Sequence, residues 1–263
     1  MLYMALFYIT SKWVEVMFST LQQGRLTMLE MLGQIVKKLV ELPEEKLGML
    51  YDLLVKLTSR RAPRWWSELG RFLRRENPFI ISEIRQEWEG FYREYFHLTV
   101  DFSDVQIPNN PSFAFGRLIF IPKDLNIWRV MKGMRDCFQV ADYQGDLAEE
   151  ITENIRQTDK SYAFYIRERE EADEELKNLS ANKLSELGIN CMTFLERLVY
   201  GLKYHSETRQ HLDNQNQTLC AGSRYRGGRV PLVHYDANDS KLHINWCGPG
   251  HAYDDLRARQ VFS

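Results

Sequence analysis

The stretch VPLVHYDANDSKLHINWCG, residues 230–248, decides how the C-terminal part of this chain folds. Two runs of alternating residues flank DANDS, a cluster of turn-forming residues. Side chains alternate between the two faces of a strand, so the second run has an apolar and a polar face. The apolar face carries Leu242, Ile244 and Trp246, and the polar face carries His243, Asn245 and Cys247. The pattern predicts two short strands of a sheet that is half open to solvent.

Other short segments with the same two-residue period surround this pair. TLCAGSRY, from Thr218, precedes it, and ARQVF, from Ala258, follows it. The turn-forming runs RGG and PGHAYDD separate these segments. We therefore expect the chain after Thr218 to consist of short strands and turns, with Trp246, Val230, Val233, Leu242, Ile244 and Val261 as its scaffold.

Upstream, helical and extended patterns alternate. TFLERLVYGLKYHSET is the clearest helix, because Thr193 and Glu196 have the spacing of a capping box. A helix capped by Ser180 and stopped by Gly188 precedes it. GRLIFIP, HLTVDF and SYAFYIRE predict strands, whereas SEIRQEWEGFYREYF with Ser82 as N-cap, LNIWRVMKGMRDCF, GDLAEEITENIRQ and EEADEELKNL predict helices. The fold class we predict is α+β, a helical N-terminal part followed by a mixed α+β C-terminal domain.

Three regions follow from these patterns. Residues 1–60 are predicted to form a helical hairpin that serves assembly or attachment. Its apolar stripe consists of Leu47, Leu50, Leu54 and Leu57. These helices would support assembly as a homo-oligomer, or contact a partner or a membrane, or pack on the same domain's core. Residues 61–97 form a helical basic and aromatic segment, and residues 98–263 form an α+β domain.

The segment from Arg60 to Arg75 interleaves arginines with Trp65, Trp66 and Phe72. Arginines beside stacking aromatic rings suit single-stranded nucleic acid, so a nucleic-acid-associated protein is an alternative function. Acidic residues dilute the positive charge, which favours an ordinary amphipathic helix. In that helix the arginines are solvated and Trp65, Leu69, Phe72 and Leu73 are buried.

Bulk composition limits the remaining functions. The formal net charge of the 263 residues is −2, which gives no global footprint for nucleic acid or a membrane. The apolar run 1–9 is too short for a transmembrane span. Four widely spaced cysteines without a CxxC pair, and no evident secretory signal, predict reduced thiols and a cytoplasmic protein.

The tail concentrates residue types that carry chemistry, but not in a recognisable motif. Potential metal ligands are Cys220, His234, His243, Cys247 and His251. No zinc-type spacing joins them, so we expect no metal and no other cofactor. An enzyme using the neighbourhood of Cys220, Ser223 and His234 is a second alternative, although Ser223 is not in a GxSxG motif. We predict no catalytic residue.

The composition of the tail favours binding instead. The last glutamate is Glu207, whereas by simple proportion about six more should follow it. Aspartate persists to Asp255, so the bias is against glutamate and not against acid. Adaptable binding surfaces favour Tyr, Ser, Gly and Asn, with other short polar contacts. The predicted ligand-binding residues are His234, Tyr235, Asp236, Asn238, His243, Asn245, His251 and Tyr253, and the ligand would be an unidentified protein or surface ligand.

From Ser161 the predicted order is strand, two helices, then short strands to the C-terminus. This order, over about 161–263, resembles the C-type lectin fold. AGSR, residues 221–224, and LRARQVFS, residues 256–263, resemble the framework strands of variable proteins of diversity-generating retroelements. No Trp follows Ser223, and Leu256 and Arg257 stand in place of the family's Gly-Phe. Over nearly its whole length the chain also resembles bacterial proteins to which no function is assigned.

The resemblance implies a diversified C-terminal binding surface. Adenine-directed mutation of AAY-type codons in that family cannot yield Glu, Met, Gln, Lys or Trp. The tail's lack of Glu and Met agrees with this rule. Under the same rule, Lys241, Trp246 and Gln260 would belong to the invariant framework.

Overall fold

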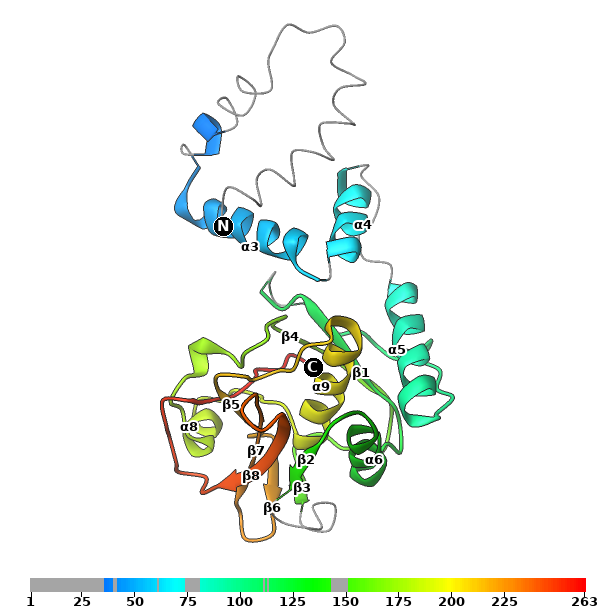
Figure 1. Cartoon of the computed structure of the whole chain (residues 1–263), viewed down its shortest axis with the longest axis vertical. Helices are drawn as coiled ribbons and strands as arrows, with labels where there is room; N and C mark the ends of the chain where they lie inside the picture. The colour runs from blue at the N-terminus through cyan, green and yellow to red at the C-terminus, as the bar shows by residue number, and fades with distance from the viewer. Residues whose placement is uncertain are drawn as a thin grey trace, which may run out of the picture. The chain divides into compact units, whose positions relative to one another are not determined.

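The computed structural model describes residues 36–39, 42–60, 62–73, 81–110, 112, 114–142 and 151–263 (Figure 1). The chain forms two compact units, Met1–Phe79 and Ile80–Ser263. The predicted segment 61–97 is therefore divided between the two units. The helix predicted from LTMLEMLGQIVKKLV lies mostly outside the described residues, which include its helical turn at 36–39.

The described part of the first unit contains two helices, α3 (Glu44–Thr58) and α4 (Ala62–Leu73). Pro43 is the N-cap of α3, where its missing amide hydrogen is not needed. Lys56 lies between the two helices: its Nζ is 2.7 Å from an Asp52 carboxylate oxygen and 4.6 Å from the centre of the Trp65 ring. The helix predicted from the apolar stripe of Leu47, Leu50, Leu54 and Leu57 is confirmed.

Apolar side chains on these helices are largely uncovered. Leu57 is buried, but Phe72 is 64% exposed and Leu73 is 55% exposed, so the expectation that both are buried is wrong. In the described part of this unit, the other exposed large apolar residues are Val36, Leu47, Met49, Tyr51 and Val55. Arg61, Arg74 and Arg75 lie outside the described residues. Assembly and nucleic-acid binding through this region stay predictions.

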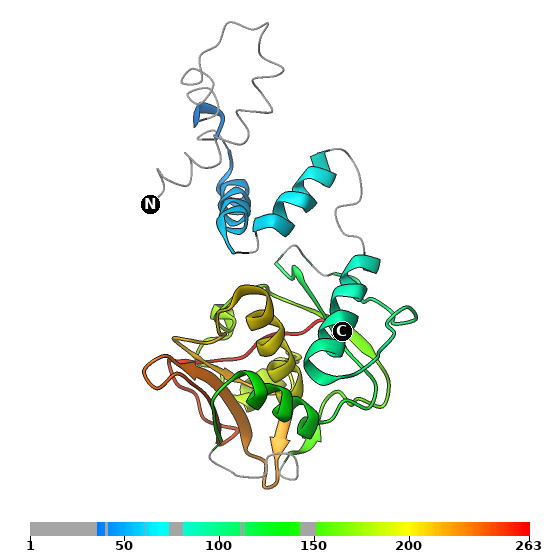
Figure 2. The same cartoon turned by 45° about the vertical axis from the view of Figure 1, so that its right-hand side comes forward.

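The second unit is built around a two-stranded antiparallel sheet of β1 (Arg117–Ile121) and β4 (Tyr162–Ile166). Helices α5 (Ile81–Phe96), α6 (Ile127–Cys137) and α9 (Phe194–Thr208) contribute to the same core, and α6 and α9 lie side by side (Figures 1 and 2). Trp88 and Tyr92 of α5 donate side-chain hydrogen bonds to the backbone of β1, at 3.2 and 2.7 Å. Helices and mixed sheets together confirm the α+β class.

A five-stranded sheet lies beside this core. Its order is β2 (Val140–Asp142), β8 (Lys241–Cys247), β7 (Val230–Asp236), β5 (Gln217–Leu219) and β9 (Leu256–Arg257). The β7–β8 pair is antiparallel, and its register places Val233 opposite Ile244 and His234 opposite His243. The predicted hairpin is thus present, with alternating faces.

The two faces of this hairpin are covered differently from the prediction. Leu242 and Ile244 enter the main core, as expected. Cys247, predicted on the polar face, is buried together with Val230 and Leu232 in a smaller core. Helix α8 (Ala181–Glu186) supplies Ala181 and Leu184 to this smaller core. Of the polar face of β8, only the half nearest the turn is therefore open to solvent.

Other predicted elements differ from the structure. Residues 151–154 of the expected helix GDLAEEITENIRQ form strand β3 (Ile151–Asn154), which pairs with β6 (Ser223–Tyr225). Helix α5 begins at Ile81, so Ser82 is not its N-cap. HLTVDF forms no strand, and EEADEELKNL contains only the 3-10 turn η1 (Glu174–Leu176). The final segment makes isolated bridges, Cys191 with Gln260 and Tyr165 with Phe262, in place of a continuous strand.

Helix α9 is anchored at its N-terminus by a buried carboxylate. The capping box of Thr193 and Glu196 is present as predicted. Glu196 also accepts hydrogen bonds from Arg156, at 2.6 and 2.7 Å, and from the Tyr162 hydroxyl, at 2.8 Å. The cap of α9 is therefore joined to β4 and to the segment that follows β3.

A second buried network of hydrogen bonds joins α9 to the loop that follows it and to the C-terminal segment. Asp213 accepts hydrogen bonds from Arg197, at 2.7 and 2.9 Å, and from Arg259, at 2.6 Å. The Thr218 hydroxyl and the Ala172 backbone amide donate to the same carboxylate. Burial opposes the charge of Asp213, but the two guanidinium groups hold its pKa below the ordinary value. We call Asp213, Arg197, Arg259 and Thr218 the Asp213 network.

Substituting Asp213→Asn should destabilise the protein by about 3–5 kcal/mol, because it leaves two buried guanidinium groups without their counter-ion. Asn retains the positive backbone φ of 59° at this position, so the change removes the charge and one acceptor oxygen without straining the backbone. Urea unfolding of the full chain measures the effect. As the control, Glu186→Ala removes the exposed ion pair with Lys183 and should cost less than about 0.5 kcal/mol. Equal effects for the two variants would contradict the role of the network.

Candidate functional site at the turn of the β7–β8 hairpin

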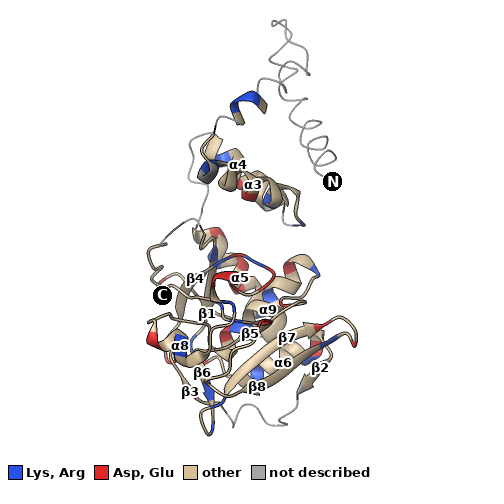
Figure 3. Cartoon of the chain, turned by 90° about the vertical axis from the view of Figure 1, so that its left-hand side faces the viewer, with Lys and Arg blue, Asp and Glu red and all other residues tan. Residues whose placement is uncertain are grey.

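The turn between β7 and β8 is organised by two aspartates. Asp236 accepts hydrogen bonds from the backbone and side-chain amides of Asn238, both at 2.8 Å. Asp239 accepts from the backbone amide of Lys241 at 3.1 Å. Figure 3 shows acidic residues at this end of the hairpin, whereas most of both strands is uncharged. The turn thus holds two carboxylates at fixed positions at the end of the sheet.

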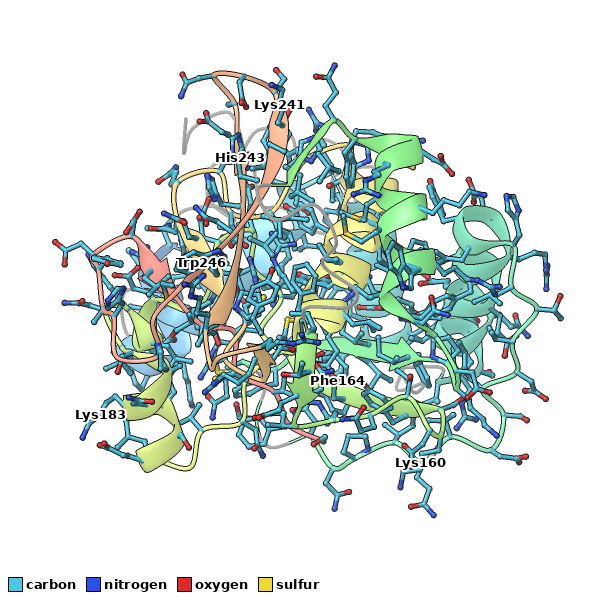
Figure 4. The ribbon with its side chains drawn as sticks, turned by 90° about the horizontal axis from the view of Figure 1, so that it is seen from below. Lys160, Phe164, Lys183, Lys241, His243 and Trp246 are labelled. Carbon is cyan, nitrogen blue, oxygen red and sulfur yellow. The ribbon has the colours of Figure 1, made fainter. Side chains whose placement is uncertain are left out.

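Two histidines lie beside these carboxylates. The Nε2 atom of His243 is 3.0 and 3.1 Å from the two carboxylate oxygens of Asp239. His234, directly opposite on β7, stacks on His243 with ring centroids 5.1 Å apart and an interplanar angle of 18°. Burial and the neighbouring His243 lower the pKa of His234, and its Nδ1 atom is buried with no hydrogen-bond partner in the described part of the chain. Figure 4 shows Lys241 and His243 at this end of β8.

Asp236, Asp239 and His243 each direct a ligand atom to a common place. These atoms all lie within 4.8 Å of one another. None of the tail's other candidate ligands, Cys220, His234, Cys247 and His251, belongs to such a group among the described residues. Sequence reasoning did not select Asp239. Its position four residues before His243, across a tight turn, was the signal that could have identified it.

The structure brings four of the eight predicted binding residues together: His234, Asp236, Asn238 and His243. Asn245 is exposed further along β8, and its side chain accepts from the Trp246 backbone amide at 2.8 Å. His251 and Tyr253 pair with each other at 3.0 Å in the loop that follows β8, beyond the opposite end of the strand from the turn. These last two residues do not share the surface at the turn.

Tyr235 points to the opposite face of the hairpin. It stacks on His211 with ring centroids 3.6 Å apart, and His211 in turn stacks on His205 at 4.8 Å. Phe138, after α6, contacts the edges of both histidines. Tyr235 therefore packs in an aromatic stack that joins β7 to the ends of α6 and α9.

The residues of the alternative enzyme site are occupied structurally. Cys220 is fully buried, and burial raises the pKa of its thiol. The Ser223 hydroxyl donates to Asn154 at 2.5 Å and accepts from the Phe194 amide at 2.9 Å. All four cysteines are free, and Cys137 is the exposed one. Neither Cys220 nor Ser223 presents a free nucleophile to solvent.

Two hollows lie elsewhere in this unit. One has a volume of about 1080 Å³ and is lined mainly by residues 101–109 and 155–163, and the other has about 330 Å³ beside α8. Arg156 and Tyr162 line the larger hollow, and both bind Glu196. The residues at the β7–β8 turn line neither of these two hollows, and residues 237–240 are exposed to solvent.

No helix among the described residues is both long enough and apolar enough to cross a membrane. The chain matches no protein-family model, no curated protein and no solved structure. The function considered below therefore depends on the geometry of the chain itself.

Acid should destabilise the protein through its half-buried histidines. Burial lowers the pKa of His211 to about 4, with a contribution from His205, whose pKa burial also lowers. Unfolded histidines bind protons near pH 6.5, so between about pH 6.5 and 4 the unfolded state binds more protons than the folded state. The free energy of unfolding should therefore fall as the pH falls through this window.

Urea unfolding at a series of pH values between 7 and 5 measures this dependence. His211→Gln should reduce its slope, whereas His251→Gln, at an exposed position, should keep the slope of the wild type. A slope that His211→Gln does not change would contradict the assignment.

Proposed function

We propose that the C-terminal unit is a non-enzymatic ligand-binding domain whose contact surface includes the turn of the β7–β8 hairpin. The observation that carries the proposal is the convergence of His234, Asp236, Asn238 and His243 at one solvent-accessible end of the sheet. Their side chains offer both hydrogen-bond donors and hydrogen-bond acceptors, and two hydrophobic cores hold the strands that carry them. Recognition of a protein or another surface ligand by short polar side chains on a rigid scaffold is the chemistry such a surface supports.

The different contacts of buried and exposed polar residues in the tail support the proposal. Buried polar residues such as Asp213, Thr218 and Arg259 bind one another. By contrast, Asp236 and Asn238 bind each other within the turn. Substitution at the turn therefore removes few contacts that hold the fold together, so the surface can vary at small cost.

The proposal extends to a C-type lectin-like arrangement of residues 161–263. The order of β4, α8, α9 and the strands β5 to β9 supports it, as does the return of Phe262 to bridge Tyr165 of β4. In such an arrangement the chain ends beside its first strand, and the intervening strands are free to present loops.

Diversification by a retroelement is part of the same proposal. The absence of Glu after Glu207 supports it. So do the contacts of two residues that adenine-directed mutation could not produce. The Trp246 ring lies 3.6 Å from the Arg229 guanidinium carbon, and the Gln260 side chain accepts from Arg167 at 3.1 Å. Both behave as framework.

A display library tests the binding surface. Randomising the four converging positions His234, Asp236, Asn238 and His243 together and selecting against hen egg-white lysozyme, an arbitrary protein target, should yield folded binders. A control library randomises four exposed positions away from the hairpin and the following loop, among them Lys123, Lys160 and Lys183. Loss of folded display in the first library, or equal enrichment in both, would refute the proposed surface.

Natural variation tests the diversification. Coding sequences from related strains should differ mostly at AAY-type codons of exposed tail positions such as Asn238 and Asn245, and a reverse-transcriptase gene with a near-copy of the final codons should lie nearby. Codons for Trp246 and Gln260 serve as the internal control and should stay unchanged. Differences spread evenly along the tail would argue against diversification and would leave the binding proposal intact.

A further inference from the structure

A cation-binding geometry exists at the turn of the β7–β8 hairpin. One oxygen each from Asp236 and Asp239 and one nitrogen of His243 lie within 4.8 Å of one another. The Asp239 oxygens are 3.0 and 3.1 Å from His243 Nε2, a separation that two ligands of one metal ion commonly have when each lies about 2.1 Å from it. Three donors on one short hairpin therefore need little rearrangement to share an ion.

The charges at this turn favour a cation. Two carboxylates with one imidazole leave a negative site whenever the histidine is neutral. The Lys241 ammonium already lies 3.8 Å from an Asp239 oxygen, and 42% of its side chain is exposed. A divalent ion would replace this long, solvated contact and the 3.0 Å contact between His243 and Asp239.

A second, independent observation concerns His234. Its ring stacks on His243, yet its Nδ1 atom is buried and makes no hydrogen bond within the described part of the chain. Buried polar atoms without a partner are uncommon in folded proteins and call for a specific explanation. The His234 ring stacks on the proposed ligand His243, so a water molecule bound to an ion at this site is one partner that would satisfy its Nδ1 atom.

We propose that Asp236, Asp239 and His243 bind one divalent transition-metal ion of the Zn²⁺, Co²⁺ or Mn²⁺ class. The imidazole nitrogen favours these ions over Mg²⁺ and Ca²⁺, which prefer all-oxygen sites. Three protein ligands leave at least one coordination position open on an exposed surface. That position would take a carboxylate, imidazole or water from a bound partner, and this role rests on the proposed ligand-binding function, whereas ion binding itself does not.

Isothermal titration of the full chain with Zn²⁺ tests the site. The wild type should show one saturable site that Asp239→Asn and His243→Gln each weaken at least about tenfold, with Asp236→Asn as a third ligand variant. The matched control, His97→Asn, removes an exposed imidazole at a position of positive φ outside the group and should leave the affinity unchanged. Circular dichroism of each variant confirms that the chain is still folded.

Two results would overturn the inference: no saturable binding by the wild type, or binding that none of the three ligand variants weakens. Such binding would be attributed to other groups, for example the exposed Cys137 thiol. The lysozyme selection, carried out with a chelator present, is independent of this titration. Failure of the titration with success of that selection would remove the metal site alone, and the opposite pair of results would remove the proposed binding surface alone.

Discussion

The fold of the C-terminal unit depends on the carboxylate of Asp213, which is enclosed by the guanidinium groups of Arg197 and Arg259. A buried charge of this kind is stable only when its partners are present with good geometry. The three residues come from a helix, from the loop that follows it and from the end of the chain. Because each buried charge requires its partners, the network fixes the position of the last segment of the chain.

The same network positions the candidate site. Thr218 donates to Asp213 and pairs with Val233 of β7, and the Asp213 carbonyl accepts from the Tyr235 amide at 3.0 Å. Strand β7 is thus held in register by the network, and β8 follows it through seven paired residues. The turn extends beyond the part of the hairpin that α8 covers. A rigid base with a free end is the arrangement that a contact surface or a metal site requires.

Patterns carried by neighbouring residues could be predicted from the sequence. The alternation in Lys241–Cys247 and the capping box at Thr193 are local, and both are present in the structure. Burial that depends on a distant element could not be predicted. Cys247 has a polar-face position in the strand, but α8 covers it. Strand β3 carries a helical pattern that its pairing with β6 overrides.

The candidate site was predictable only in part, for the same reason. Histidine and short polar residues indicated the hairpin as a candidate site, but the role of Asp239 follows from the turn that brings its carboxylate to His243. No local pattern marks Arg197 and Arg259 as buried, because their shared partner Asp213 is distant from Arg259 along the chain. The loop that contains His251 has a composition similar to that of the turn, but it lies at the other end of β8.

We propose that the tail consists of a fixed framework and a surface that the fold does not need. Proteolytic stability of every single substitution in residues 208–263 of the full chain tests it most directly. We expect intolerance at Asp213, Thr218 and Arg259, and tolerance of most residue types at Asn238, Asn245 and Tyr253. If substitutions at the exposed positions destabilise the protein as much as those in the network, the tail has no separable binding surface and the account is wrong.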